Sequence, residues 1–120
     1  MMKPRFFSYK ACGTCRKSKK WLAEQSIELE EIAIRETPPS IDEFRLALQC
    51  GYPLKALFNS SGGDYREMGM KDKLPTLSES EALDLLHAHG NLVKRPFVVT
   101  DTGVLVGFKL PEWETFFGKS

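Results

Sequence analysis

Two cysteines separated by two residues, Cys12 and Cys15 in the segment Cys-Gly-Thr-Cys, are the side chains whose type and spacing best suit chemistry. The apolar, strand-like run Phe6–Tyr9 precedes them, and a run of helix formers begins near Arg16. A thiol at the turn from a strand into a helix lies near the partial positive charge of the helix N-terminus, which stabilises a thiolate. The second thiol lies one turn further along the same helix face, within reach of a disulfide. The spacing therefore predicts a redox-active pair.

Half of a zinc site and an inert pair of reduced thiols are the alternatives for this motif. A structural zinc site needs about four ligands, often from two such motifs, and the chain has no second C-x-x-C. Cys50, His87 and His89 are not spaced as ligands. We therefore expect no metal site. We expect Cys50, at the end of a predicted helix, to be buried as a small apolar side chain.

Length and charge exclude several classes of protein. The chain has 120 residues, 42% of them hydrophobic, which suits a single domain over residues 1–120. Seventeen basic and sixteen acidic side chains give a formal charge of +1, so we expect no direct binding to nucleic acid. No apolar run approaches the roughly 20 residues that span a bilayer, and we expect neither a signal peptide nor a membrane partner. Sparse cysteines suit a monomer in the cytoplasm better than a secreted disulfide scaffold.

The elements that must position the thiols follow from the patterning. A strand over 5–9, a helix over 15–25 and a strand over 27–34 form a β-α-β unit. The alternation of the second strand slips once, at residues 30–31. A right-handed crossover makes the two strands parallel and brings the thiol turn to the carboxyl end of the first strand, where ligands of α/β sheets bind.

The middle of the chain is predicted to be helical. Two of its helices begin with capping boxes, at Ser40 and Ser78, in which a serine and the glutamate three residues on cap each other's backbone amides. We expect this all-helical insertion to occupy about residues 38–90. Two short strands then flank a hairpin turn at 101–103, and a helix over 111–117 follows.

The order β-α-β, helical insertion, β-β-α is that of an α/β, thioredoxin-like fold with a central all-helical insertion. Such folds usually carry a cis-proline at the start of the third strand, facing the thiol turn, and Pro96 stands there. We predict a cis bond, because the cis form of an X-Pro bond is only about 0.5–1 kcal/mol less stable than trans. Arg95, beside it, would bring a permanent positive charge to the thiolate. Lys10, Arg16 and Lys17 would add to the positive potential.

Three segments carry a resemblance to a known family: 7–17, 92–99 and 106–108. They resemble the glutaredoxin-linked arsenate reductase (ArsC) and Spx family, and the resemblance runs nearly end to end. It extends to Asn59-Ser60-Ser61-Gly62, as in a branch of small relatives with two cysteines. The resemblance implies the same thioredoxin-like fold.

The resemblance implies roles for only some positions. It places the nucleophile at Cys12 and an anion-binding arginine at Arg95. Cys15 stands where the arsenate reductases usually have serine and where Spx has cysteine. Two further oxyanion-binding arginines of the family are replaced, at Asn59 and at Phe108.

Three functions follow from these observations. The first is a thiol reductase with catalytic residues Cys12, Cys15 and Arg95, no bound cofactor, and glutathione or a thioredoxin or glutaredoxin as electron donor. The second is an Spx-like redox-sensing regulator that binds the RNA polymerase α subunit, and the third is a non-catalytic interaction module. The residues that we expect to bind the substrate or an anion surround the thiols: Lys10, Gly13, Thr14, Arg95 and Pro96.

Overall fold

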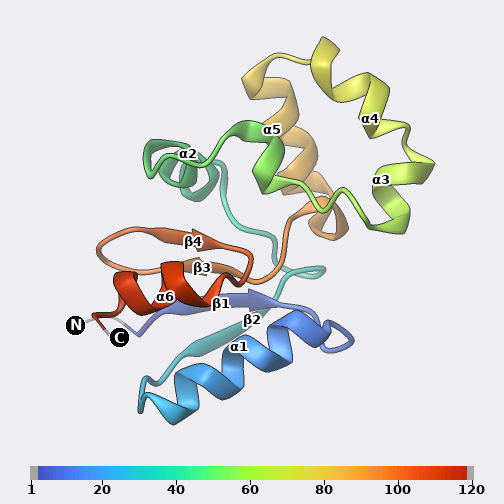
Figure 1. The fold of residues 1–120 in the computed structure, drawn as a ribbon. Helices are drawn as coiled ribbons and strands as arrows, with labels where there is room; N and C mark the ends of the chain where they lie inside the picture. Colours follow the sequence, from blue (N-terminus) through green and yellow to red (C-terminus); the bar gives the residue numbers. More distant parts are fainter. Residues whose placement is uncertain (1–2, 119–120) are drawn as a thin grey trace.

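A four-stranded mixed sheet forms the central layer of the computed structural model, which describes residues 3–118 (Figure 1). The strand order is β2-β1-β3-β4. The strands are β1 (Arg5–Ser8), β2 (Glu30–Ala33), β3 (Phe97–Val99) and β4 (Val104–Val106). β1 pairs in parallel with β2 and antiparallel with β3, which forms a hairpin with β4. Because β1 and β3 run in opposite directions, the end of β1 and the start of β3 meet at the same end of the sheet.

Two helices, α1 (Gly13–Glu24) and α6 (Leu110–Phe116), cover one face of the sheet (Figure 1). Phe6, Val98 and Leu105 point to this face and pack against Leu22 of α1 and Trp113 of α6. All five side chains are buried. This small core fixes the helix that begins at the thiol turn against the sheet.

The helical insertion covers the opposite face. Its elements are α2 (Ile41–Gln49), the 3-10 turn η1 (Leu54–Leu57), α3 (Gly63–Glu67), α4 (Met70–Lys73), the 3-10 turn η2 (Leu74–Thr76), α5 (Glu79–Ala88) and the 3-10 turn η3 (Gly90–Leu92). Phe7 and Phe97 of the sheet pack against Phe44 of α2, and the rings of Phe44 and Phe97 meet edge to face at 5.4 Å. The predicted α/β, thioredoxin-like order with a helical insertion is confirmed.

Capping boxes formed by neighbouring residues begin the two longest helices of the insertion. The predicted capping boxes are both present, with Ser40 and Glu43 at the start of α2 and with Ser78 and Glu81 at the start of α5. Each box satisfies two backbone amides that a helix N-terminus leaves without intrahelical partners.

The second strand is shorter than the predicted 27–34. Ser26 adopts a left-handed conformation with a φ of 60°, and the N–H of Ile27 bonds back to the carbonyl of Leu22. Ile27 and Leu29 then pack against the core between α1 and α6, and β2 begins only at Glu30. The alternation of apolar residues at 27–29 therefore reflects packing against this core, and not pairing with β1.

One prediction about the helical insertion is wrong. Cys50 is exposed, because it follows the last residue of α2 and lies beyond the buried face of that helix. Further along the chain, α3 begins at Gly63, directly after the segment Asn59-Ser60-Ser61-Gly62. None of the helices in residues 3–118 has the length and apolar character needed to cross a membrane.

A tyrosine ties the outer edge of the sheet to the helices on both sides of it. The hydroxyl of Tyr52, which follows α2, accepts a hydrogen bond from the backbone N–H of Val106 in β4 at 3.2 Å. The same hydroxyl donates to the carboxylate of Glu112 in α6. Burial and this carboxylate raise the pKa of Tyr52, so the phenol keeps its proton and donates it.

Candidate active site

The thiol turn connects β1 to α1. The N–H of Cys12 donates to the carbonyl of Tyr9 at 2.9 Å, which closes the turn. Cys12 has extended backbone angles and is the N-cap of α1, and its Sγ accepts a hydrogen bond from the N–H of Cys15 at 3.2 Å. A sulfur thus takes the position that a serine or aspartate oxygen usually occupies at a helix start. Helix α1 consequently begins at Gly13, earlier than predicted.

The two thiols differ in exposure. Cys12 is half-buried, whereas Cys15 is only 2% exposed and belongs to the core between α1 and α6. Burial, followed by the hydrogen bond with Cys12, raises the pKa of Cys15 to about 12. Arg95 acts in the opposite direction, by its positive charge, but more weakly. Cys15 is therefore a protonated thiol at neutral pH, beneath a more accessible partner.

The start of β3 brings Arg95 and Pro96 to the same end of the sheet. The peptide bond between them is cis, as predicted. The guanidinium of Arg95 lies 5.2 Å from the ring centre of Tyr9, directly after β1, and the charge of Arg95 reaches Cys15. A second arginine, Arg35, lies 4.9 Å from the same ring and donates to the Tyr9 hydroxyl at 2.9 Å. Two guanidinium groups thus lie against the phenol ring of Tyr9, beside the thiol turn.

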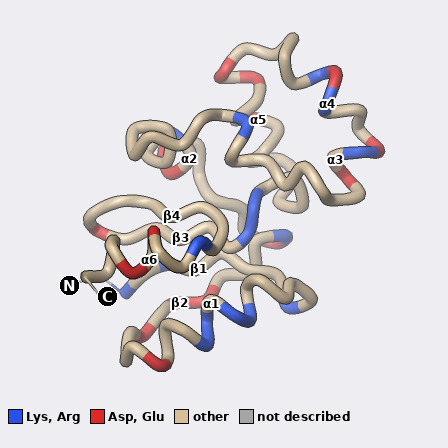
Figure 2. Tube along the Cα trace, viewed as in Figure 1, with Lys and Arg blue, Asp and Glu red and all other residues tan. Residues whose placement is uncertain are grey.

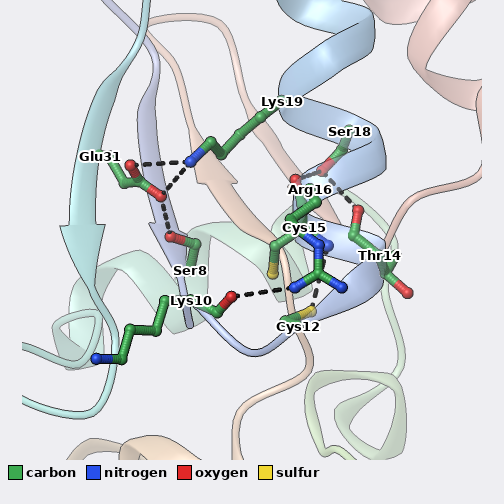
Figure 3. A network of polar contacts seen from close by, with 9 residues as sticks. All are labelled: Ser8, Lys10, Cys12, Thr14, Cys15, Arg16, Ser18, Lys19 and Glu31. Atoms are coloured by element: carbon green, nitrogen blue, oxygen red, sulfur yellow. Dashed lines mark hydrogen bonds and ion pairs between the residues drawn. The ribbon is translucent and has the colours of Figure 1, made fainter.

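Other basic residues around the turn take different positions. Arg16 folds back over the turn and donates from Nη1 to the carbonyl of Lys10 at 3.2 Å (Figure 3). A Cβ on Gly13 would lie 3.7 Å from Nη2 of Arg16, so the guanidinium covers the exposed backbone of Gly13. The side chain of Lys10 points away from both sulfurs (Figure 3). Lys10 is thus not in position to contact a group bound at Cys12.

Lys10 lines a hollow of about 450 Å³ on the β2 side of the turn, together with Glu31 and Glu36. Glu31 accepts hydrogen bonds from the Ser8 hydroxyl at 2.7 Å and from the Lys19 ammonium at 3.0 Å (Figure 3). The Ser8 hydroxyl, and then Lys19, lower the pKa of Glu31. Sequence reasoning missed this network, and the only signal for it was the slip in alternation at residues 30–31.

The remaining predicted residues lie around Cys12. Thr14 is exposed on the first turn of α1. Asn59 and Phe108, which stand in place of the family's arginines, are both only partly exposed. The ring of Phe108 packs edge to face on Trp113 at 4.8 Å, and the Asn59 N–H donates to the carbonyl of Leu92 at 2.7 Å. The Phe108 ring thus packs against α6, and the Asn59 backbone pairs with the last residue of η3.

The turn itself supplies two thiols. In the part of the chain that the structure describes, no group of three or more histidine, cysteine, aspartate or glutamate side chains is arranged to hold a metal ion. A cysteine pair joined by a helix-capping contact can exchange electrons as a dithiol and a disulfide.

Comparisons with known proteins agree with this geometry. The chain is 48% identical over 110 residues to the uncharacterized protein YusI of Bacillus subtilis (strain 168), covering 91% of this chain and 93% of YusI. It is 34% identical over 94 residues to an arsenate reductase of Escherichia coli, covering 77% of this chain and 64% of the reductase. It thus spans less than two thirds of that reductase.

A solved structure has the same fold. It is the crystal structure of an ArsC family related protein from Bacteroides fragilis, which is 47% identical and superposes with a TM-score of 0.88 over 95% of this chain and 98% of the other. The model of the ArsC family matches residues 7–116, from β1 to the last residue of α6. The chain belongs to the ArsC family.

Proposed function

We propose that this protein is a thiol-disulfide reductase in which Cys12 is the nucleophile and Cys15 the resolving thiol. The observation that supports this most is the asymmetry of the pair, with a half-buried Cys12 sulfur capping α1 and a buried Cys15 thiol beneath it. A thiolate at Cys12 gains from the helix dipole and from the N–H of Cys15. A buried thiol is protected from solution oxidants and reaches only its partner.

The reaction takes two thiol-disulfide exchanges. The Cys12 thiolate attacks one sulfur of the substrate disulfide, forms a mixed disulfide, and releases the other sulfur as a thiolate that takes a proton. Cys15 then loses its proton and attacks Sγ of Cys12, which releases the second substrate thiol and leaves a Cys12–Cys15 disulfide. The substrate gains two electrons and two protons, and the enzyme is oxidised by two electrons.

A thiol donor must then reduce the Cys12–Cys15 disulfide. We propose glutathione or a thioredoxin or glutaredoxin for this role, with no bound cofactor, in a monomer that acts in the cytoplasm, where such donors are kept reduced. Arg95, stacked beside the turn on Tyr9, would hold a carboxylate of the donor or an oxyanion.

Arsenate is a further candidate acceptor, because curated relatives are arsenate reductases. In this chain Arg95 would have to bind the oxyanion without the two arginines replaced by Asn59 and Phe108. Coupled arsenate reduction is therefore compared in the wild type and in Arg95→Ala. An activity indifferent to that change would contradict the anion-binding role.

Cysteine variants test the reductase itself. Mild oxidation of the wild type should remove two of its three free thiols, at Cys12 and Cys15, as mapped by mass spectrometry. Cys12→Ser should reduce a model disulfide no faster than the uncatalysed background. Cys15→Ser should instead accumulate a stable mixed disulfide on Cys12. Cys50→Ser, which removes an exposed thiol remote from the turn's motif, is the matched control and should keep full activity. Turnover by Cys12→Ser equal to that of the wild type would overturn the proposal.

A redox-sensing regulator is the second candidate, and the two-thiol motif shared with Spx favours it. Here the oxidation of Cys12 and Cys15 would change binding to the RNA polymerase α subunit. Purified α subunit is titrated with reduced and with oxidised protein. An affinity that depends on oxidation, in a protein without measurable disulfide turnover, would replace the enzyme by the regulator.

A further inference from the structure

A second hollow adjoins the thiol turn on the side opposite Glu31. It is a groove of about 580 Å³ whose wall includes Thr14, directly between the two cysteines. The rest of its lining comes from η1 and the residues on both sides of it, from Lys94 before the cis-proline, and from the end of β4 and its connection to α6. Its volume lies in the range of ligand sites, roughly 300–1,000 Å³. A molecule attacked by Cys12 could therefore extend into this groove.

Three lysines, Lys55, Lys94 and Lys109, line the groove, and no aspartate or glutamate does. All three side chains are exposed, and none takes part in an ion pair within residues 3–118. Figure 2 shows basic residues both on the segment that leads into β3 and along α1. The groove therefore presents three positive charges without ion-pair partners, in a hollow whose wall includes the residue directly before Cys15.

Backbone contacts hold these lysines in place. The N–H of Lys94 donates to the carbonyl of Leu57 at 2.8 Å, and Phe58 and Val93 form a β-bridge, so η1 lies beside the segment before Pro96. Gly107 has a φ of 72°, and a Cβ there would lie 3.4 Å from Cε of Lys94. The glycine thus leaves room for the stem of Lys94 along the groove.

Lys109 stands at the N-cap of α6 and makes no capping hydrogen bond. A cation at this end of a helix opposes the helix dipole. Its charge therefore does not stabilise the helix.

We propose that this groove binds the acidic flank of a protein disulfide, so that the substrates of this enzyme carry aspartate or glutamate beside the cysteine that Cys12 attacks. The three lysines would pair with these carboxylates. The groove also offers apolar contact, from the partly or fully exposed side chains of Pro53, Ala56 and Phe108. Glutathione has carboxylates but little apolar surface, which favours a peptide segment as the occupant. The proposal rests on the thiol-disulfide exchange proposed above, with the same two-electron balance and the same thiol donor.

Matched peptides test the proposal. Three disulfide-linked peptides carry acidic, amide or basic residues beside the cystine, and their reduction is followed with dithiothreitol as donor. For the wild type we expect kcat/KM to be about tenfold higher for the acidic peptide than for the amide peptide, as three weak ion pairs together would give. The triple variant Lys55→Ala/Lys94→Ala/Lys109→Ala should lose this preference and keep its rate on the amide peptide.

Two control variants keep the test specific. Lys20→Ala/Lys71→Ala/Lys73→Ala removes the same charge from exposed positions outside the groove and should retain the preference. Arginine at all three groove positions should also retain it, which separates a role of charge from a loss of folding.

Two results would overturn the proposal. One is an equal kcat/KM of the wild type for the acidic and amide peptides. The other is a loss of glutathione disulfide reduction, in the alanine triple variant, as large as the loss on the acidic peptide, which would make the groove a glutathione site. Failure of the reductase proposal looks different, because the wild type would then reduce none of the peptides faster than Cys12→Ser.

Discussion

The hollows on the two sides of the thiol turn differ in how their charges are arranged. On the β2 side, Lys19 and Ser8 satisfy the carboxylate of Glu31, and Lys10 lines the same hollow as Glu31 and Glu36. On the other side, three lysines line a groove without any carboxylate. A formal net charge of +1 for the whole chain conceals this local asymmetry.

The difference separates charges that support the fold from charges that are free for a ligand. A carboxylate that already accepts two hydrogen bonds gains little from a further partner, whereas an unpaired ammonium group gains the full interaction with an incoming anion. Cys12, the proposed nucleophile, lies between Lys10, which lines one hollow, and Thr14, which lines the other. In the proposed reaction, charge would set the direction from which a substrate approaches, and the thiols would reduce it.

The largest change in peptide preference should come from reversing the charge of the three groove lysines. In Lys55→Glu/Lys94→Glu/Lys109→Glu, the ratio of kcat/KM for the acidic over the basic peptide should fall by about 100-fold. Each reversed contact is worth about 1 kcal/mol at an exposed site, and 1.4 kcal/mol is a factor of ten. The same reversal at Lys20, Lys71 and Lys73 is the control, and an equal fall there would show that only net charge matters.

A smaller effect is expected from Arg95→Ala, which changes the rate at which Cys15 resolves a mixed disulfide on Cys12. Arg95 lowers the pKa of Cys15, so its removal raises that pKa further and leaves less Cys15 thiolate. Release of a peptide held on Cys12 as a mixed disulfide should slow about fivefold at pH 7. Stopped-flow fluorescence of a labelled peptide measures this step.

The pH dependence of the same step provides the check. Burial is the largest cause of the raised pKa of Cys15 and does not depend on Cys12 being a free thiol. We therefore expect Cys15 to stay protonated between pH 6 and 9 in the mixed disulfide, so the rate should rise about tenfold per pH unit in wild type and variant alike. A rate that levels off near pH 7 would contradict a buried resolving thiol.

High salt should lower kcat/KM for the acidic peptide more than for the amide peptide. Raising the ionic strength from about 0.01 M to about 1 M shortens the Debye length from about 30 Å to about 3 Å. We expect kcat/KM for the acidic peptide to fall about threefold. The amide peptide is the internal control, and a parallel fall for both would place the salt effect on the thiols.

The smallest effect is expected in the hollow on the β2 side, where Glu31→Gln should slightly lower the free energy of unfolding. The pKa of Glu31 is lowered below its ordinary value of 4.5 by Ser8 and Lys19, so this carboxylate stabilises the folded state above that pH and ceases to do so as the pH falls through its folded pKa. Because Glu31 is largely exposed, the loss at pH 7 should be only about 0.5 kcal/mol.

Denaturant unfolding at pH 7 and at pH 3 measures this difference, which should shrink at the lower pH. Lys94→Ala should leave the unfolding free energy unchanged at both. A loss of peptide preference in Glu31→Gln would show that the two hollows are not separate.

Features carried by neighbouring residues could be predicted from the sequence. The thiol turn needs only a strand, two cysteines and a helix start, and the capping boxes at Ser40 and Ser78 need only a serine and a glutamate on one turn. The cis-proline position followed from the order of elements, and Pro96 is indeed cis.

Features made by tertiary packing could not be predicted in this way. Lys55, Lys94 and Lys109 come from three separate segments. The contact of η1 with the chain before β3 brings Lys55 beside Lys94, and the pairing of β3 with β4 brings the segment of Lys109 to the same place. Cys50 lies one residue beyond a helix whose apolar face ends before it, so its exposure depends on where that helix stops.

The hydroxyl of Tyr52 has a further consequence for how the protein meets other chains. β4 is an edge strand, and an exposed edge of unpaired amides invites aggregation or the addition of a foreign strand. Tyr52 already occupies the outward N–H of Val106, and β4 is only three residues long. A neighbouring chain therefore finds little backbone to extend at this edge.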